Sequence, residues 1–214
     1  MNIDIDPIEK AGLITRTVDT VDRDGKPAKR LTAARSYPTS IEDLWDTVTN
    51  VERIPRWFMP ITGDLHVGGR FQLEGNAAGE VLACEPPRHF EITWEYGGEV
   101  SWVTVEFSGD PGGDEADLVL QHVAHVPDEM WDQFGPGAVG IGWDLGLMGL
   151  DLHITTGEAV SPEEVQSWDA TPEAADFKSR SSTAWAEASI ASGTDRADAL
   201  ACAERVTAFY TATE

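Results

Sequence analysis

The chain carries little positive charge. It has 15 Lys and Arg residues against 38 Asp and Glu residues, which gives a formal net charge of −23 at pH 7. A field of that sign repels phosphate backbones, so nucleic acid is excluded as an expected partner. The acidic residues are spread along the chain without forming blocks, which is typical of a solvated acidic surface rather than an acidic tail. Solubility is the commonest meaning of such a surface, and a salt-rich habitat is the alternative.

Long apolar runs and cysteine are also scarce. No run approaches the roughly 18 residues of a membrane span. The first residues, MNIDIDPIEK, are acidic and lack the apolar core of an export signal. Cys84 and Cys202, the two cysteines, lie far apart in the chain. Free thiols are therefore a simpler interpretation than a disulfide, and we expect a cytoplasmic protein without a membrane span.

The common motifs of metal and cofactor chemistry are missing as well. Five histidines occur, but no H-x-x-x-H, H-E-x-x-H or C-x-x-C spacing joins them or the cysteines into a metal site. No phosphate-binding G-x-x-x-x-G-K-[ST] and no G-x-S-x-G nucleophile motif is present. The glycine-rich GPGAVGIG follows a loop rather than a strand, which argues against a dinucleotide site. We predict no metal, no cofactor and no assigned catalytic residue.

The N-terminal third predicts a hairpin and a short helix. Residues 13–37 alternate around an Asp-Gly turn, which favours two paired strands. Thr39 and Glu42 fit a capping box for a helix that follows. Four apolar residues in that helix repeat at helical spacing: Ile41, Leu44, Trp45 and Val48. A second helical turn is expected over residues 51–54, before Pro55.

Short alternating segments separated by turns follow from about residue 64. They read GRFQLEG, GEVLACEPP, RHFEITWEY, SWVTVEFSG and ADLVLQHVAHV, and they predict an antiparallel meander with one packed and one wet face. The alternation places Phe71, Trp94 and His122 on packed faces. Glutamates such as Glu91 alternate to the wet face.

The pattern then changes to helices. Gly135 to Glu158 has a wide apolar face and predicts one long helix, although Gly140, Gly142, Gly146 and Gly149 lie inside it. Each glycine costs about 1 kcal/mol relative to Ala, so either another backbone comes close or space is left beside the helix. A polar connector follows, and residues 172–192 and 195–211 predict two alanine-rich helices that dock on the main domain or on a partner chain.

The order of hairpin, short helix pair, meander and long helix is the helix-grip layout. Six segments resemble the START-related SRPBCC superfamily, and within it the activator of heat-shock protein ninety ATPase homologue-like branch: SYPTSIEDLWDTVTNVERIPRWF, VGGRFQLEG, GEVLACEPPRHFEITWEY, VTVEF, LVLQH and GWDLGLMGLDLHI. They span roughly residues 30–155. The segment AWAEASIASGTDRADALACAERVTAFYTA looks like an extension of some bacterial members.

The resemblance implies an α+β helix-grip fold, in which a curved antiparallel sheet wraps around a long C-terminal helix. Two short helices would follow the first strands, and two extra helices would end the chain. We accordingly predict a START-like domain with its N-terminal hairpin over residues 1–158, and a connector with a docked helical extension over residues 159–214. The resemblance also implies an elongated internal cavity between the sheet and the long helix. Members bind lipids, sterols, polyketides or other apolar molecules, and a few act as cyclases or hydrolases.

Nine residues are candidates for the ligand-binding wall of that cavity: Trp57, Phe58, Phe71, Leu73, Trp94, Val105, His122, Trp143 and Leu147. An inward His122 either orients a polar ligand group or is a core histidine bonded within the protein. Trp57 and Phe58, held between prolines in RIPRWFMP, either close one end of the cavity or plug the core.

Three functions follow from these observations. The first is binding of a small apolar or amphipathic molecule. The second is a cyclase or hydrolase that uses the same cavity, with His122 as the candidate acid or base. The third is a co-chaperone-like or regulatory interaction module, which predicts a filled interior and an exposed patch of Trp102, Trp168 and Trp185. Trp102 is expected beneath the C-terminal helices or at a homodimer contact.

Overall fold

The N-terminal hairpin forms where the alternating sequence predicts it. The computed structural model describes residues 6–212, and in it β1 (Thr15–Arg23) and β2 (Lys26–Tyr37) are joined by Asp24 and Gly25. These two turn residues have φ values of 54° and 74°. Two central residues with positive φ match the right-handed twist of a two-residue hairpin. The predicted Asp-Gly turn is therefore confirmed.

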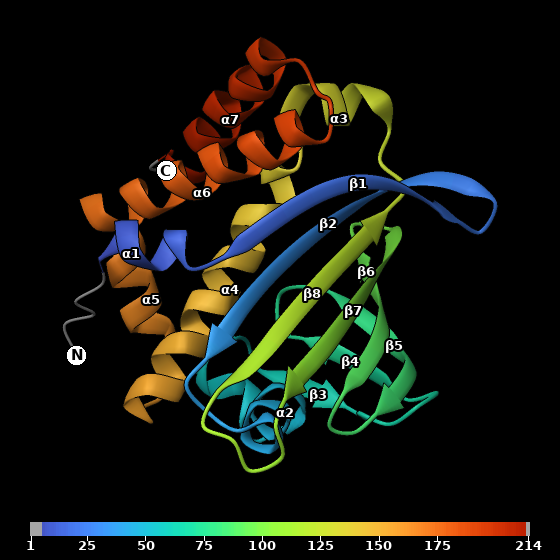
Figure 1. Ribbon diagram of the computed structural model, residues 1–214, viewed down its shortest axis with the longest axis vertical. Coiled ribbons are helices and arrows are strands. Elements are labelled where there is room, and N and C mark those ends of the chain that lie inside the picture. Colours follow the sequence, from blue (N-terminus) through green and yellow to red (C-terminus); the bar gives the residue numbers. More distant parts are fainter. Residues whose placement is uncertain (1–5, 213–214) are drawn as a thin grey trace. The chain divides into compact units, whose positions relative to one another are not determined.

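The remaining strands build one antiparallel sheet with the hairpin. They are β3 (Ile61–Gly63), β4 (Arg70–Leu73), β5 (Ala78–Glu85), β6 (His89–Tyr96), β7 (Glu99–Gly109) and β8 (Ala116–Ala124). The strand order is β1-β2-β8-β7-β6-β5-β4-β3 (Figure 1). The predicted meander is confirmed in β4 to β8. Strand β3 was not predicted, because three residues are too few to show a period.

Helices complete the predicted α+β fold. They are α1 (Pro7–Gly12), α2 (Ile41–Thr49), the 3-10 turn η1 (Ile54–Arg56), α3 (Asp128–Phe134), α4 (Gly137–Thr156), α5 (Pro162–Asp169), α6 (Pro172–Ala191) and α7 (Arg196–Thr211). The long helix and the two C-terminal helices lie where they were predicted. In the described part of the chain, none of these helices has the length and apolar character that crossing a membrane requires.

The cap of α2 differs from the prediction by one residue. Ser40, not Thr39, is the N-cap, and its Oγ accepts the Asp43 backbone N–H at 3.2 Å. Thr39 instead donates its hydroxyl to the Asp43 carboxylate at 2.8 Å. The helix begins at Ile41, one residue later than a box of Thr39 and Glu42 requires. Two members of the predicted apolar face, Ile41 and Leu44, are buried.

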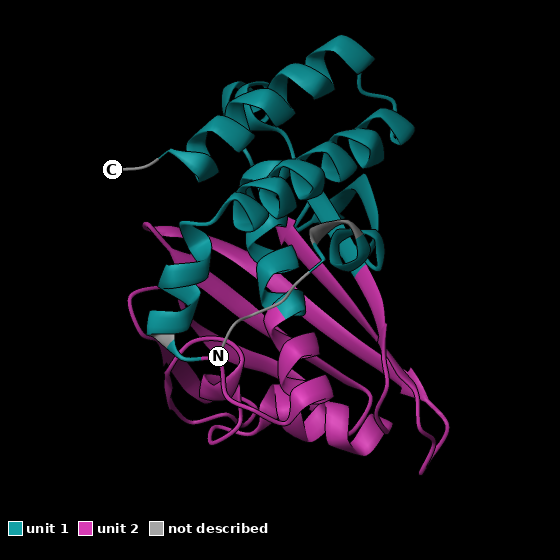
Figure 2. Cartoon of the chain, turned by 90° about the vertical axis from the view of Figure 1, so that its left-hand side faces the viewer, with its two compact units in different colours: residues 1–33, 125–148, 161–214 teal, residues 34–124, 149–160 magenta. Residues whose placement is uncertain are grey.

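The chain divides into two compact units (Figure 2). Unit 1 contains residues 1–33, 125–148 and 161–214, and unit 2 contains residues 34–124 and 149–160. The domain boundary predicted between residues 158 and 159 stays a prediction.

Unit 1 has its own aromatic core, around α6. This helix contacts α1, α5, α7 and β1. Phe177 and Trp185 of α6 and Trp168 of α5 are buried, with exposed fractions of 0%, 1% and 8%. The interaction-module hypothesis predicted that Trp168 and Trp185 belong to an exposed patch, and for these two residues the prediction is wrong. Both tryptophans lie in the core of unit 1, where they supply the large apolar side chains that the alanine-rich helices otherwise lack.

A buried carboxylate of α4 ties unit 1 together. Oδ2 of Asp144 accepts hydrogen bonds from Arg16 Nε at 2.9 Å, from Trp185 Nε1 at 3.1 Å and from the Ser181 hydroxyl. Asp144 is fully buried, and burial raises the pKa of its carboxyl although the Arg16 charge and these hydrogen bonds act to lower it. One charge thus joins β1, α4 and α6.

Three glycines of α4 have identifiable neighbours. In unit 1, a Cβ at Gly140 would lie 2.4 Å from the Trp185 ring, whereas at Gly142 the nearest atom would be 3.8 Å away. In unit 2, a Cβ at Gly149 would lie 2.5 Å from the carbonyl oxygen of Trp57. Close approach therefore explains Gly140 and Gly149, and only Gly149 meets another backbone.

Candidate functional site

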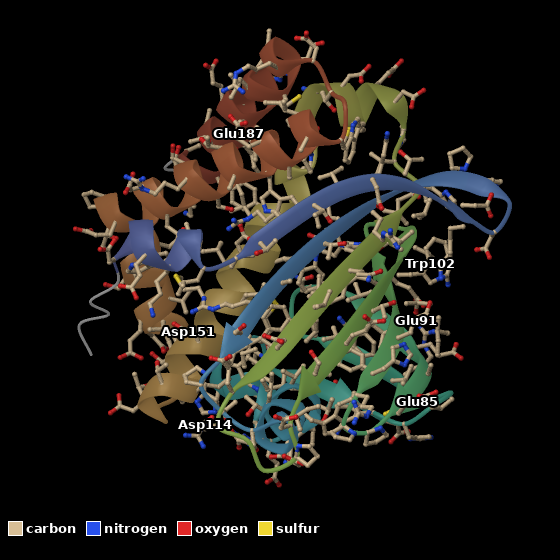
Figure 3. The ribbon with its side chains drawn as sticks, viewed as in Figure 1. Glu85, Glu91, Trp102, Asp114, Asp151 and Glu187 are labelled. Atoms are coloured by element: carbon tan, nitrogen blue, oxygen red, sulfur yellow. The ribbon has the colours of Figure 1, made fainter. Side chains whose placement is uncertain are left out.

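One face of the sheet in unit 2 carries most of the predicted wall. Directly paired residues of an antiparallel ladder lie on the same face. Three rungs cross this face: Phe90–Val105–Leu120, Ile92–Val103–His122 and Trp94–Ser101. We call this the inner face, because Val103, Val105, Leu120 and His122 on it are buried. Glu91 and Trp102 alternate to the opposite, outer face, where Figure 3 labels them.

Burial is uneven across the inner face. Val103, Val105 and Leu120 are only 2%, 4% and 6% exposed. Their β6 neighbours on the same rungs, by contrast, are half-buried, and so is Trp94. One of them, Phe90, contacts Trp45 of α2 edge to face, with ring centroids 6.2 Å apart. The inner face is therefore partly exposed along β6, whereas the facing valines of β7 and Leu120 of β8 are buried.

His122 introduces a polar group on the buried side of this surface. Its Nε2 lies 2.8 Å from Ser101 Oγ, and the Ser101 hydroxyl lies 3.1 Å from the Trp94 carbonyl oxygen. The Ser101 hydroxyl thus bridges the imidazole and the backbone carbonyl, and the tautomer of His122 sets which atom donates in the first of these bonds. Burial lowers the pKa of His122 to about 4. The imidazole is therefore neutral at pH 7, and it is bonded within the protein as the core-histidine alternative proposed.

Two predicted wall residues on β4 are buried on the inner face. Phe71 pairs with Gly79 and Leu73 pairs with Ile61, and their exposed fractions are 5% and 3%. A Cβ at Gly79 would lie 2.7 Å from two carbons of the Phe71 ring. The missing side chain at Gly79 therefore makes the space that the Phe71 ring fills.

Trp57 and Phe58 lie at the end of η1, and both are half-buried. Their rings stack with centroids 5.3 Å apart. Trp57 donates its indole N–H to the Thr47 carbonyl at 3.0 Å, and its own carbonyl lies against Gly149. These contacts fix Trp57 between α2 and the second half of α4. The two alternative roles of this pair, a lid or a core plug, both stay predictions.

The last two predicted wall residues belong to the other unit. Trp143 is half-buried and Leu147 is buried, and both lie in the first half of α4, in unit 1. The other seven residues lie in unit 2. The structure therefore brings five of the nine onto the inner face of one sheet, with Trp57 and Phe58 in the same unit.

Unit 2 also contains a buried ion pair that the sequence did not predict. Arg35 of β2 and Asp151 of α4 are 4% and 3% exposed, and Arg35 Nη2 lies 2.5 Å from Asp151 Oδ1 (Figure 3 labels Asp151). The Arg35 guanidinium carbon lies 5.2 Å from the centroid of the Tyr37 ring, which is fully buried. Burial raises the pKa of the Tyr37 phenol above its ordinary value, so it stays protonated.

The signal for this pair was present in both elements. Ala33, Arg35 and Tyr37 alternate on one side of β2, so an arginine occupies an inward position. Asp144 and Asp151 are seven residues apart, which places both on one side of α4. A carboxylate among apolar helix residues requires a cationic partner, and the hairpin supplies one for each aspartate: Arg16 and Arg35.

The pair leaves donors unsatisfied. Nε and Nη1 of Arg35 have no hydrogen-bond partner within the described residues. Burying a donor without a partner costs about 1–3 kcal/mol. Within the same described range, no group of three or more His, Cys, Asp or Glu side chains could hold a metal ion.

Comparison with known proteins supports the fold. Residues 38–153, more than half of the chain, match the family model described as activator of Hsp90 ATPase homolog 1-like protein. No curated protein matches the chain.

Solved structures of similar proteins include CalU16 from Micromonospora echinospora. Its crystal structure has 30% sequence identity and a TM-score of 0.64, and covers 82% of this chain and 97% of CalU16. Its solution NMR structure has 29% identity and a TM-score of 0.68, and covers 84% of this chain and 97% of CalU16. DynU16, described as a putative protein in the dynemicin biosynthetic locus, has 18% identity and a TM-score of 0.51, and covers 61% of this chain and 48% of its own. At that identity the likeness to DynU16 shows the fold alone.

Proposed function

Because the chain belongs to the family of activator of Hsp90 ATPase homolog 1-like proteins, we propose that it binds a small apolar or amphipathic molecule on the inner face of its sheet. Proteins of this fold typically bind hydrophobic ligands. Fold alone does not fix function, so the proposal depends on the inner face itself.

The observation that carries the proposal is the uneven burial of that face. Ile92 and Trp94 are half-buried although they share rungs with buried or inward residues of β7 and β8. Apolar surface removed from water by a ligand contributes roughly 25 cal/mol per Å². The Trp94 and Ile92 side chains on β6 therefore offer an apolar surface that a flat apolar ligand would cover.

The enzyme hypothesis finds less support. A general base works best with a pKa near the operating pH, and His122 has its pKa lowered to about 4. Its Nε2 is also engaged in a hydrogen bond with the Ser101 hydroxyl. His122 suits the role of a fixed neutral group in the wall better than that of a proton acceptor.

The interaction-module hypothesis loses two of the three tryptophans on which it depended. We therefore favour a small molecule over a protein client, as hydrophobic ligands are typical of this fold. We also propose a cytoplasmic location, for which the two free cysteines are the support. The homodimer contact at Trp102 stays a prediction.

The binding proposal can be tested with N-phenyl-1-naphthylamine, a neutral probe whose fluorescence rises in apolar surroundings. We expect a saturable rise with the wild-type chain. Ile92→Trp should weaken binding about tenfold or more, equivalent to about 1.4 kcal/mol, because the larger ring fills the uncovered surface. Glu91→Trp is the matched control, since it adds the same ring to the same strand on the outer face. Equal weakening in both variants, or no saturable signal in the wild type, would refute the proposal.

A further inference from the structure

The inner face opens toward the turn that joins β6 to β7. Tyr96 lies on the same side of β6 as Trp94, because the two are two residues apart on a strand. It is 61% exposed, and its partner on β7, Glu99, is exposed as well. On the next rung of this face, Trp94 and Ser101 are both half-buried. Solvent therefore reaches the inner face from the turn end.

Aromatic side chains close the opposite end of the same surface. Trp45 of α2 packs edge to face against Phe90 and Phe107, with ring centroids 6.2 Å and 5.3 Å apart. Phe90 and Phe107 also contact each other, with centroids 6.1 Å apart. Phe107 is only 4% exposed, so the protein itself fills this end. Trp45 and Phe90 are half-buried, and the cluster therefore keeps some ring surface that solvent reaches.

The polarity of the inner face changes between these two ends. At the closed end Phe90 pairs with Val105, and both side chains are apolar. Toward the turn Trp94 pairs with Ser101, which brings a hydroxyl group onto the face. Phe90 and Trp94 are four residues apart on β6, which corresponds to about 13 Å of strand. An amphipathic molecule would gain most with its apolar part at the closed end, because burying an unpaired polar group is unfavourable.

We propose that Trp45 is a specificity-determining residue, which ends the binding surface and sets the greatest length of apolar group that lies along β6. This inference rests on the proposed binding function and narrows it to elongated amphipathic molecules. Such a ligand lies with its apolar end against Trp45 and its polar end toward the turn between β6 and β7. Each carbon added to a short apolar group gains contact with the inner face, whereas a group that is too long meets the indole.

Neutral 4-n-alkylphenols of increasing chain length test the proposal. Displacement of N-phenyl-1-naphthylamine gives their affinities, measured below the concentration at which each phenol aggregates. With the wild-type chain, we expect affinity to rise about fourfold for each added methylene, the gain of burying one such group. The rise should stop at a definite chain length, which is the length limit of the surface.

Variants assign that limit to Trp45. Trp45→Ala should move the limit to a longer chain, because loss of the indole extends the surface, and Trp45→Phe should move it less. Trp102→Ala is the matched control, since it removes a half-buried indole from the outer face of the same sheet and should leave the limit unchanged. The limit is read from affinity ratios on one protein. A smaller folded fraction lowers all affinities equally, so a destabilised variant does not mimic the shift.

Cys84 reports whether the ligand reaches the closed end. It is a free, half-buried thiol that pairs with Phe90, so it lies on the inner face beside the aromatic cluster. A saturating alkylphenol should slow the alkylation of Cys84 by N-ethylmaleimide, measured by mass spectrometry of the intact wild-type chain and its peptides. Cys202 is free but buried in unit 1, so its labelling is the internal control for opening of the chain.

The outcomes separate the two proposals. If affinity rises without a limit in the wild type, or if the limit is the same in Trp45→Ala, binding stands and the role of Trp45 is refuted. An equal shift in Trp102→Ala, or unchanged labelling of Cys84 at saturation, also overturns the assignment to Trp45. If no alkylphenol binds at all, the proposed function fails together with the inference.

Discussion

His122→Gln should remove an acid-dependent loss of stability. Burial lowers the pKa of His122 from an ordinary value near 6.5 to about 4. A histidine with a lowered native pKa stabilises the folded state fully above pH 6.5, and this contribution is lost as the pH falls toward 4, because the unfolded chain binds the proton first. A difference of about 2.5 units corresponds to roughly 3 kcal/mol in total, of which about 2 kcal/mol is lost between pH 7 and pH 5.

The assay is urea denaturation of wild type and variant at pH 7 and pH 5. Glutamine keeps a neutral donor for Ser101 but does not titrate, and other titrating groups cancel in the comparison. We expect the wild type to lose about 2 kcal/mol more than the variant between the two pH values. Parallel losses would show that the imidazole titrates normally, and would refute the argument that it is buried and neutral.

Two further predictions concern α4. Asp144→Asn should destabilise the chain by about 3–5 kcal/mol, measured by thermal or urea unfolding, because it leaves the Arg16 charge buried without a counter-charge; a loss below about 1 kcal/mol would show that the pair is solvated. Gly149→Ala should cost about 1–3 kcal/mol through collision with the Trp57 carbonyl, whereas the control Gly142→Ala has 3.8 Å of room and should gain up to about 1 kcal/mol. Equal effects of the two alanines on the unfolding midpoint would contradict the close approach.

Local sequence patterns were sufficient for most elements of the fold. The strands alternate with a period of two, and α4 shows a continuous apolar face, so both could be predicted from neighbours in the chain. The exception among longer elements is α5, which was interpreted as a polar connector. The sequence signals of this helix are a capping box of Ser161 and Glu164 and a proline, Pro162, in the first turn. They were missed because the segment is polar in composition.

The candidate site could be predicted only in part, because it depends on distant pairings. Alternation within each of β6, β7 and β8 predicted that Trp94, Val105 and His122 face inward. The strand register places all three on the same face. Local patterns carry no information on which arginine reaches which aspartate. The pairing of Arg35 with Asp151 was therefore missed, and the assembly of the nine wall residues around one ligand stays a prediction.

The two arginine–aspartate pairs have a consequence for synthesis on the ribosome. Each joins a residue of the hairpin to a residue of α4 more than one hundred positions later. At about 5–20 residues per second, the hairpin waits roughly 6–26 seconds before its partner helix is synthesised. During that interval both arginines keep their hydration, and the hairpin cannot bury its inward side. Neither ion pair can form before α4 has been synthesised, so both are late contacts in the folding of the nascent chain.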